Sequence, residues 1–211
     1  MTRCTPMPSK EHWNDVYSRK ASNTVSWFQP RASVSLELIH KAGVGTSAKI
    51  IDVGGGTSTL IDDLICEGHS ELTVLDLSVQ ALAVARSRLG DKADAVTWLE
   101  ADITKVQLAD STYDLWHDRA VFHFLISPED RNAYVRTVER SVKPGGAVII
   151  ATFAEDGPEK CSGLPVMRYS TERLHDEFGV SFALVEHATE EHQTPSGAMQ
   201  SFVYCLLRKK S

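Results

Sequence analysis

The stretch that decides the fold is Lys49-Ile50-Ile51-Asp52-Val53-Gly54-Gly55-Gly56-Thr57-Ser58. Its first half is apolar and β-branched apart from Asp52, which is typical of a short, buried parallel strand. Three consecutive glycines follow, and they permit positive φ and a close approach of a ligand to the backbone. Thr57 or Ser58 can then cap a helix that continues to Cys66. This order of strand, glycine turn and helix predicts the nucleotide-binding corner of a doubly wound α/β sheet.

The alternation of strands and helices continues along the chain. We expect further strands over 72–76, 96–100, 113–118 and 147–153, and two closing strands over 180–187 and 198–207. Helices are predicted ahead of and between these strands, and serines stand where N-caps are expected, at Ser9, Ser78, Ser127 and Ser170. No internal repeat or low-complexity segment interrupts the pattern, which predicts one α/β domain.

Length, charge and cysteine spacing exclude several classes of protein. The 211 residues fit one domain, and the net charge of −6, with a basic run only over 208–210, argues against nucleic acid as the main partner. No apolar run approaches the ~18 residues of a membrane span, and the first residues lack the apolar core of a signal peptide. The four cysteines are far apart, so we expect no metal site, no disulfide framework and a reducing, cytoplasmic location.

Asp52 followed by Gly54 and Gly56 resembles motif I of the class I S-adenosylmethionine-dependent methyltransferases. The resemblance runs over about residues 10–207. It implies a Rossmann-like, doubly wound, mainly parallel seven-stranded sheet that ends in an antiparallel hairpin. A single methyltransferase domain of residues 1–211 would then comprise a helical leader (1–45), a cofactor-binding core (46–153) and an acceptor side (154–211).

The resemblance implies S-adenosylmethionine as the cofactor, with S-adenosylhomocysteine as its product. Asp76 ends the second strand, where a carboxylate can accept both ribose hydroxyls of an adenosyl group. Asp102 matches the family's acid that binds the adenine amino group, and Ile103 could pack on the ring. The alternative for Asp102 is the cap of a short turn. The remaining residues expected around the cofactor are Gly54, Gly55, Gly56, Leu77 and His117, with Asp52 beside them.

Aromatic residues are dense in the leader. Trp13, Tyr17 and Trp27 resemble the segment ahead of motif I in a methyltransferase subgroup that includes protein-lysine methyltransferases, where this leader helps to enclose the cofactor. The alternative is an amphipathic cover that only shields the sheet. Pro6 and Pro8 predict an irregular start over residues 1–8.

Candidate catalytic residues are His117, Asp118 and Arg119, which resemble motif IV, where the chain leaves the sheet beside the sulfonium. Methyl transfer from a sulfonium needs alignment above all, and a base only when the acceptor is protonated. His117 can serve as that base because an unperturbed histidine titrates near pH ~6.5. It can equally be a structural histidine, and Asp118 can orient the acceptor or pair with Arg119.

Candidate acceptor-binding residues lie in the long connection over 154–169, which leaves the carboxyl end of the fifth strand. Arg168 could clamp a carboxylate and Tyr169 could present a hydroxyl. Cys161 could bind the acceptor or be inert. His192, in a second insert, would face this connection across the pocket, or both segments are plain connections.

These observations predict an enzyme that moves the sulfonium methyl group to a nucleophilic acceptor, either a small metabolite or a protein lysine. Two alternatives stay open. One is a nicotinamide-dependent oxidoreductase, although its fingerprint needs a third glycine where Thr59 stands. The other is a non-catalytic methyltransferase-like binding module. We expect a monomer or homodimer.

Overall fold

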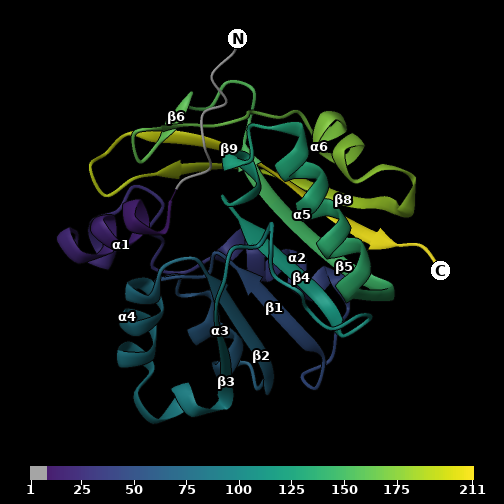
Figure 1. Cartoon of the computed structure of the whole chain (residues 1–211), viewed down its shortest axis with the longest axis horizontal. Coiled ribbons are helices and arrows are strands. Elements are labelled where there is room, and N and C mark those ends of the chain that lie inside the picture. Colours follow the sequence, from purple (N-terminus) through teal and green to yellow (C-terminus); the bar gives the residue numbers. More distant parts are fainter. Residues whose placement is uncertain (1–8) are drawn as a thin grey trace.

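A seven-stranded sheet forms the centre of the computed structural model, which describes residues 9–211 (Figure 1). The strand order is β3-β2-β1-β4-β5-β9-β8. Strands β1 to β5 run parallel, and β9 pairs antiparallel with both β5 and β8. The predicted seven-stranded, mainly parallel sheet with an antiparallel hairpin at its end is confirmed. The irregular start expected over residues 1–8 lies outside the described residues.

The strands occupy the predicted places, except that β5 begins at Val142, ahead of the predicted start at residue 147. Their bounds are β1 Lys49–Val53, β2 Glu71–Asp76, β3 Val96–Glu100, β4 Tyr113–Arg119, β5 Val142–Phe153, β8 Phe182–Gln193 and β9 Met199–Lys209, with the short β6 Lys160–Cys161 and β7 Leu164–Pro165 forming a separate hairpin. The long connection after β5 therefore contains a small hairpin of its own.

The helices are α1 Lys10–Arg19, α2 Ser33–Ala42, α3 Leu60–Cys66, α4 Val79–Leu89, α5 Pro128–Ser141 and α6 Thr171–Phe178. All four predicted serine caps are confirmed, because each hydroxyl accepts the backbone N–H three residues later. The cap of α3 differs from the expectation. Thr59 occupies the N-cap position without a side-chain hydrogen bond, while the Ser58 hydroxyl accepts from Leu60 N at 3.1 Å.

The closing hairpin is longer than predicted. Residues 189–197 read as a polar connection, yet β8 extends to Gln193 and pairs with β9 down to the couple Gln193 and Met199. Alternate side chains of this polar run point inward and find partners: the Glu190 carboxylate accepts from Tyr204, and the His192 ring contacts the carbonyl of Ser26. Polar residues with buried partners thus continue the strand.

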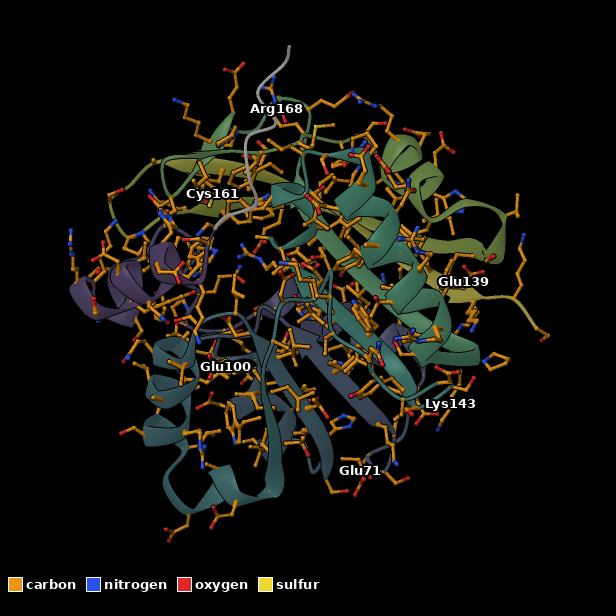
Figure 2. The ribbon with its side chains drawn as sticks, in the orientation of Figure 1. Glu71, Glu100, Glu139, Lys143, Cys161 and Arg168 are labelled. Atoms are coloured by element: carbon orange, nitrogen blue, oxygen red, sulfur yellow. The ribbon has the colours of Figure 1, made fainter. Side chains whose placement is uncertain are left out.

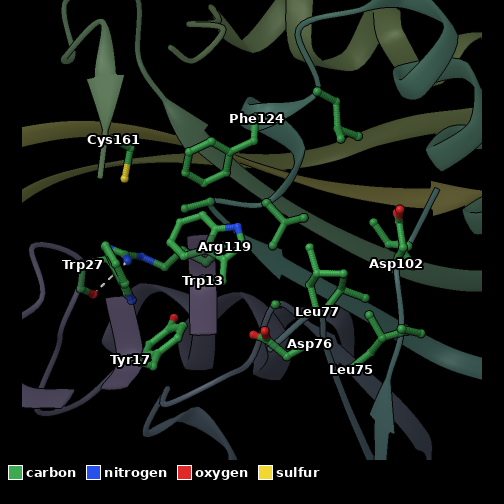
Figure 3. Close-up of a pocket in the computed structure, with 17 residues that line it drawn as sticks. Trp13, Tyr17, Trp27, Leu75, Asp76, Leu77, Asp102, Arg119, Phe124 and Cys161 are labelled. Carbon is green, nitrogen blue, oxygen red and sulfur yellow. Dashed lines mark hydrogen bonds between the residues drawn. The ribbon is translucent and has the colours of Figure 1, made fainter. Parts of the chain in front are cut away.

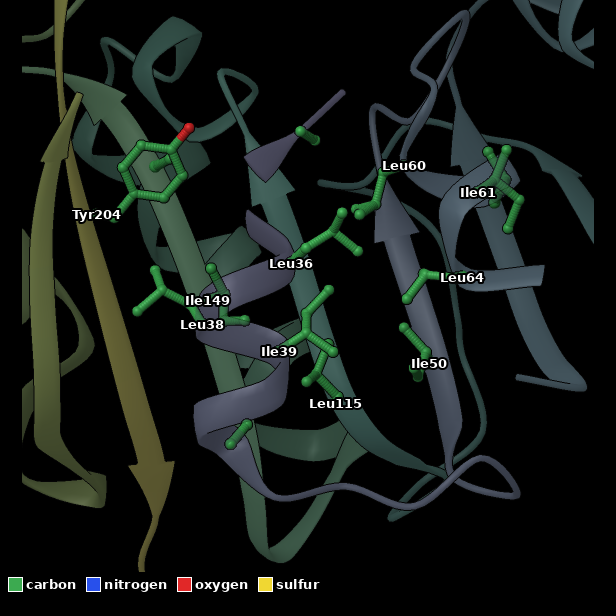
Figure 4. Close-up of a cluster of buried hydrophobic side chains, with 14 of the residues drawn as sticks. Leu36, Leu38, Ile39, Ile50, Leu60, Ile61, Leu64, Leu115, Ile149 and Tyr204 are labelled. Atoms are coloured by element: carbon green, nitrogen blue, oxygen red, sulfur yellow. The ribbon is translucent and has the colours of Figure 1, made fainter. Parts of the chain in front are cut away.

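Two apolar layers cover the sheet. On one face, α2, α3 and α4 pack against the strands through residues such as Leu36, Ile39 and Leu64 (Figure 4). On the other face, α5 and α6 pack through Tyr134 and Leu174. Successive side chains of a strand point to opposite faces of the sheet, so each apolar layer contains every second side chain of a strand.

The parallel strands all begin at one end of the sheet and finish at the other. We call the end at which they finish the carboxyl edge. Glu71 at the start of β2 and Glu100 at the end of β3 mark these two ends in Figure 2. The leader helix α1 lies beside α4 at the carboxyl edge (Figure 1), where Asn14 meets the cap of α4: the Ser78 hydroxyl donates to Asn14 Oδ1 at 2.7 Å. Open α/β sheets hold ligands at this edge.

Candidate functional site

A pocket opens at the carboxyl edge of the sheet, between the strand ends and the leader (Figure 3). Its walls come from the glycine turn after β1, the ends of β2 and β3, the segment after β4, the aromatic residues of the leader, and Cys161. A second hollow continues from it under the loop over 27–29 and is lined by Asp52, His117 and Ser35. Together these two hollows surround the glycine turn.

The glycine turn leaves room that any side chain would fill. Gly54 has φ of +69°, and a Cβ placed on it would stand 2.0 Å from Cγ2 of Val121. Gly56 has φ of +38°, and a Cβ there would stand 2.7 Å from Oδ2 of Asp76 and 3.3 Å from the Tyr17 hydroxyl. Glycine at these positions therefore keeps open a cradle beside two polar groups, which is what a nucleoside ligand needs.

Asp76 lies at the bottom of the pocket with 7% of its surface exposed. Its Oδ1 accepts from Ser78 N at 2.7 Å. Burial raises the pKa of Asp76 to about 7 in spite of the backbone hydrogen bond from Ser78. A carboxylate in this position can take further donors, such as the two hydroxyls of a ribose.

We expect the affinity for S-adenosylhomocysteine to depend on the charge of Asp76. Ribose hydroxyls donate to the ionised carboxylate, so the affinity is full above the pKa of about 7 and falls as the pH drops through it. From pH ~8 to pH ~6 the dissociation constant should rise about tenfold. Calorimetry at several pH values measures this, with Asp76→Asn as the control whose affinity stays flat. An affinity that holds or rises toward pH ~6 would contradict it.

Asp102 lines the same pocket, at the end away from Cys161 and Trp27 (Figure 3). Its Oδ1 accepts from the backbone N–H and the hydroxyl of Thr104, at 3.0 and 2.7 Å, and its Oδ2 pairs with Lys105 at 2.7 Å. Burial raises its pKa, but the bonds from Lys105 and Thr104 outweigh this and hold the pKa below its ordinary value. Asp102 therefore caps a short turn, which is the alternative role that the sequence allows, and it also lines the pocket. Ile103 and Leu77 stand beside it on the wall.

Asp52 and His117 form a buried chain with Ser35 of α2. The His117 Nδ1 lies 2.7 Å from Asp52 Oδ1, and its Nε2 lies 2.9 Å from the Ser35 hydroxyl. Both ring nitrogens are thus occupied, and 2% of the residue is exposed. This geometry favours a positioning role for His117 over a base. The Asp52 Oδ2 is buried and has no partner among the described residues, which leaves it available to a donor from a ligand.

Asp118 lies away from both hollows, on the opposite face of β4. It is fully buried, and its two oxygens accept from Val121 N at 2.8 Å, Phe122 N at 3.1 Å and the Tyr134 hydroxyl at 2.6 Å. Asp118 is not among the described residues that line the two hollows, and it forms no ion pair with Arg119 there. Its bonds fix the turn after β4, so the structure assigns it to the support of the pocket wall.

Tyr134→Phe should lower the stability by about 1–3 kcal/mol and leave the affinity for S-adenosylhomocysteine unchanged. The Tyr134 hydroxyl accepts from the Trp116 indole at 2.9 Å and donates to Asp118, so its loss leaves the buried Trp116 N–H without this partner and removes one of the three donors to Asp118. Thermal unfolding and calorimetry measure the two quantities. If affinity fell together with stability, Asp118 would act in the site itself.

Arg119 reaches the pocket from the end of β4, with 9% of its side chain exposed. Its Nε donates to the Tyr204 hydroxyl at 2.9 Å, and its terminal nitrogens donate to the Trp27 carbonyl at 3.2 Å and to Glu190 at 3.3 Å. The guanidinium also lies over the ring of Phe202, 4.1 Å from the ring centre. Arg119 therefore joins the sheet, the closing hairpin and the leader.

The leader closes one side of the pocket and comes close to the glycine turn at Tyr17. Trp13, Tyr17 and Trp27 all line the pocket. Trp13 meets Trp27, at 5.8 Å between ring centres, and Phe124, at 5.2 Å, both edge to face. Trp13, Trp27 and Phe124 also pack on or in the apolar core. The same aromatic residues therefore shield the sheet and line the pocket.

Of the four acceptor-binding candidates, Cys161 alone lines the pocket among the described residues. Arg168 folds back on its own loop, where it donates to the Gly157 carbonyl and contacts Glu159. Tyr169 is 1% exposed and packs on Phe122 in the core. His192 is buried, with its Nε2 on the Ser26 carbonyl. Figure 2 shows Cys161 and Arg168 on the same long connection.

Several residues of the site were missed by the sequence analysis. Phe124 and Val121 line the pocket, Ser35 supports His117, and Glu190 and Tyr204 hold Arg119. Phe124 lies within five residues of Arg119, so the sequence could have indicated that Phe124 lies near the end of β4. Glu190 and Tyr204 lie far along the chain, and only the folded hairpin brings them to Arg119.

Comparison with known proteins identifies the class. Residues 50–146 match the family model described as "Methyltransferase domain". The chain is 30% identical over 140 residues to a malonyl-[acyl-carrier protein] O-methyltransferase of Pseudescherichia vulneris, a match that covers 66% of this chain and 52% of the relative. It is 21% identical over 141 residues to the eEF1A lysine and N-terminal methyltransferase of Mus musculus, covering 67% of this chain and 20% of that protein. The chain thus spans about half, or less, of these curated relatives.

A solved structure agrees with the fold. The N-methyltransferase NodS from Bradyrhizobium japonicum WM9, in complex with S-adenosyl-L-homocysteine, superposes with a TM-score of 0.71 at 15% identity, over 94% of this chain and 98% of that one. The methyltransferase family model over residues 50–146, the sheet order, the glycine turn and the strand-end acids together support a class I S-adenosylmethionine-dependent methyltransferase. S-adenosylmethionine is the methyl donor of this family.

Proposed function

We propose that this chain transfers the sulfonium methyl group of S-adenosylmethionine to a nucleophilic acceptor by in-line displacement. The observation that carries the proposal is the pocket at the carboxyl edge, which Gly54, Asp76 and Asp102 line together with the aromatic residues of the leader. When bound, the cofactor supplies a methyl group on a positively charged sulfur whose departure leaves a neutral thioether.

Different residues of the chain would bind different parts of this cofactor. Asp76 would accept the ribose hydroxyls, while Asp102, Leu77 and Ile103 would hold the adenine. The unpartnered Oδ2 of Asp52 offers an acceptor for the ammonium group of the methionine part, and His117 holds that carboxylate in place.

The leader excludes water and fixes the approach of the acceptor. Trp13, Tyr17 and Trp27 cover the pocket, and Arg119 ties their loop to the sheet through the Trp27 carbonyl. Alignment in a dry site is the main contribution a protein can make to this displacement. We place the acceptor between these aromatics and Phe124, on the side of the pocket where Cys161 stands.

The coarse acceptor classes stay those expected from the sequence, a small molecule or a protein. The relatives divide between them: one is named for a lysine and an N-terminus and one for an acyl-carrier protein substrate. We propose a small molecule, because the leader encloses the pocket, and a cytoplasmic monomer or homodimer. Within the described residues, no helix is long and apolar enough to cross a membrane.

Formation of S-adenosylhomocysteine tests the proposal. The full chain is incubated with methyl-labelled S-adenosylmethionine and a metabolite extract, and both S-adenosylhomocysteine and labelled products are followed by mass spectrometry. Turnover supports methyl transfer. Binding of the cofactor without turnover on any acceptor would favour a non-catalytic binding module, and preferential binding of NAD would favour the oxidoreductase.

A further inference from the structure

The acceptor end of the pocket has a distinct composition. Figure 3 shows Asp102 at one end of the pocket and Cys161 and Trp27 at the other. Around this second end stand the rings of Trp13, Trp27 and Phe124, the Cys161 thiol and the Arg119 guanidinium. Its walls are therefore apolar and polarisable, apart from one cation.

No titratable group that lines the two hollows in the described residues can take a proton from an acceptor at this end near neutral pH. Burial and the nearby Asp76 raise the pKa of Tyr17 well above its ordinary value, so its hydroxyl stays protonated. Burial raises the pKa of Cys161 to about 12. Arg119 stays charged beside Tyr204 and Glu190, although burial opposes this.

The remaining ionisable groups are committed elsewhere. Asp76 and Asp102 belong to the nucleoside end, Asp52 lines the second hollow, and both ring nitrogens of His117 are bonded. His123 is buried outside both hollows, and burial together with Arg119 lowers its pKa to about 3. The part of the chain that the structure describes therefore offers no base to an acceptor that must lose a proton inside this pocket.

Arg119 is the one cation at the acceptor end among residues 9–211, and it is already compensated. Arg119 pairs with Glu190, and the Tyr204 hydroxyl donates to the same carboxylate at 2.6 Å. Glu190 is itself held by the side chain of Gln29. A carboxylate acceptor would have to leave water without an uncompensated cation to meet it, which is costly.

We infer that the acceptor is a small thiol on an apolar carrier, which reacts as its thiolate. This inference rests on the proposed function. A cysteine-type thiol with a pKa of ~8.5 is ionised to about 3% at pH ~7, whereas a lysine-type amine with a pKa of ~10.4 is unprotonated to only about 0.04%. The thiol therefore needs no base, and its soft, weakly hydrated anion suits aromatic walls and a sulfonium partner.

The step balances without an added reagent. The thiol loses its proton to water before or during binding. The thiolate sulfur then forms a bond to the methyl carbon while the bond from that carbon to the sulfonium sulfur breaks, and the electron pair stays on the cofactor sulfur. The products are a methyl thioether and S-adenosylhomocysteine, and nothing is oxidised or reduced.

A matched series of acceptors on one carrier tests the inference with the full chain. Benzyl mercaptan, benzylamine, benzyl alcohol and phenylacetate are each supplied with S-adenosylmethionine, and S-adenosylhomocysteine is measured. We expect benzyl mercaptan to react at least about tenfold faster than benzylamine at pH ~7, because the two groups ionise at similar pH and thiolate sulfur is intrinsically the stronger nucleophile. Faster methylation of the amine, alcohol or carboxylate, or no methylation of the thiol, would overturn the inference.

The pH profile gives an independent readout. If the thiol ionises on its own, the inflection in kcat/KM follows the pKa of the thiol, and replacing benzyl mercaptan by the more acidic thiophenol moves it to lower pH. An inflection that stays fixed when the thiol is changed would reveal a base on the enzyme and would overturn the inference.

Glu190 should determine the charge preference of the site. Glu190→Gln leaves Arg119 uncompensated, and we expect phenylacetate to inhibit this variant at a concentration about fivefold lower than for the parent. Glu191→Gln, one residue away and exposed, is the control that should not change it. Calorimetry with S-adenosylhomocysteine separates the two proposals: if it binds and the thiols fail, the acceptor class alone is wrong, and if it does not bind, the proposed function fails too.

Discussion

Replacing Gly54 by alanine is expected to weaken S-adenosylhomocysteine binding at least about 100-fold, which corresponds to about 2.7 kcal/mol. The added Cβ would stand 2.0 Å from Cγ2 of Val121, and both residues line the pocket. The overlap can be relieved only if the turn after β1 or the segment after β4 moves, and either movement changes the cradle. Calorimetry on the folded variant measures the loss.

Gly43→Ala is a closely matched control. Gly43 has φ of +70° against +69° for Gly54, so alanine costs about 1–2 kcal/mol of backbone strain at each. A Cβ on Gly43, however, meets nothing within 4 Å. Both variants should lose similar backbone stability, and Gly54→Ala alone should lose binding. Equal affinities in the two variants would show that the glycine turn is needed for the fold and not for the ligand.

Trp13→Ala is expected to lower kcat/KM at least about 100-fold while changing the affinity for S-adenosylhomocysteine about tenfold or less. The Trp13 ring holds Trp27 and Phe124 at the acceptor end, and its loss opens that end to water. The leader stays attached through Arg119 and Glu190. Turnover and calorimetry separate the two effects.

Asp15→Ala is the control on the same helix, because Asp15 is exposed and pairs only with Arg19 on the surface. It should behave like the parent. Hydrogen exchange adds a direct observation: residues 10–30 of the parent should gain protection when S-adenosylhomocysteine binds, and those of Trp13→Ala should gain less. If Trp13→Ala turned over like the parent, the leader would be a cover on the core and no part of the acceptor site.

Most of the fold could be predicted from short sequence patterns. Each serine cap, the glycine turn and the apolar strands depend on residues within a few positions of one another, so they can be read along the chain. Asp76 ends β2 and Asp102 comes shortly after the end of β3, and the structure places both on the pocket wall. The hairpin was predicted too short because the polar run around Glu190 reads as a connection until its buried partners are known.

The assignment of catalytic roles depended on contacts that sequence does not show. His117 and Asp118 are neighbours, but strand alternation turns them to opposite faces, where Ser35 meets one and Tyr134 the other. The alternation itself was visible in the sequence, whereas the partners, 82 and 16 residues away, were not. The charge of Arg168 predicts a place beside the methyl acceptor. In the structure, however, its guanidinium donates hydrogen bonds to groups within its own loop.

The central claim is that the pocket at the carboxyl edge binds the adenosyl cofactor through Asp76, and calorimetry with S-adenosylhomocysteine tests it most directly. We expect one molecule bound per chain and a dissociation constant raised about tenfold or more in Asp76→Ala, because each charged hydrogen bond to a ribose hydroxyl contributes about 1.5–3 kcal/mol. The exposed Asp91→Ala should match the parent. Unchanged affinity in Asp76→Ala, or binding of NAD in preference to S-adenosylhomocysteine, would contradict the account.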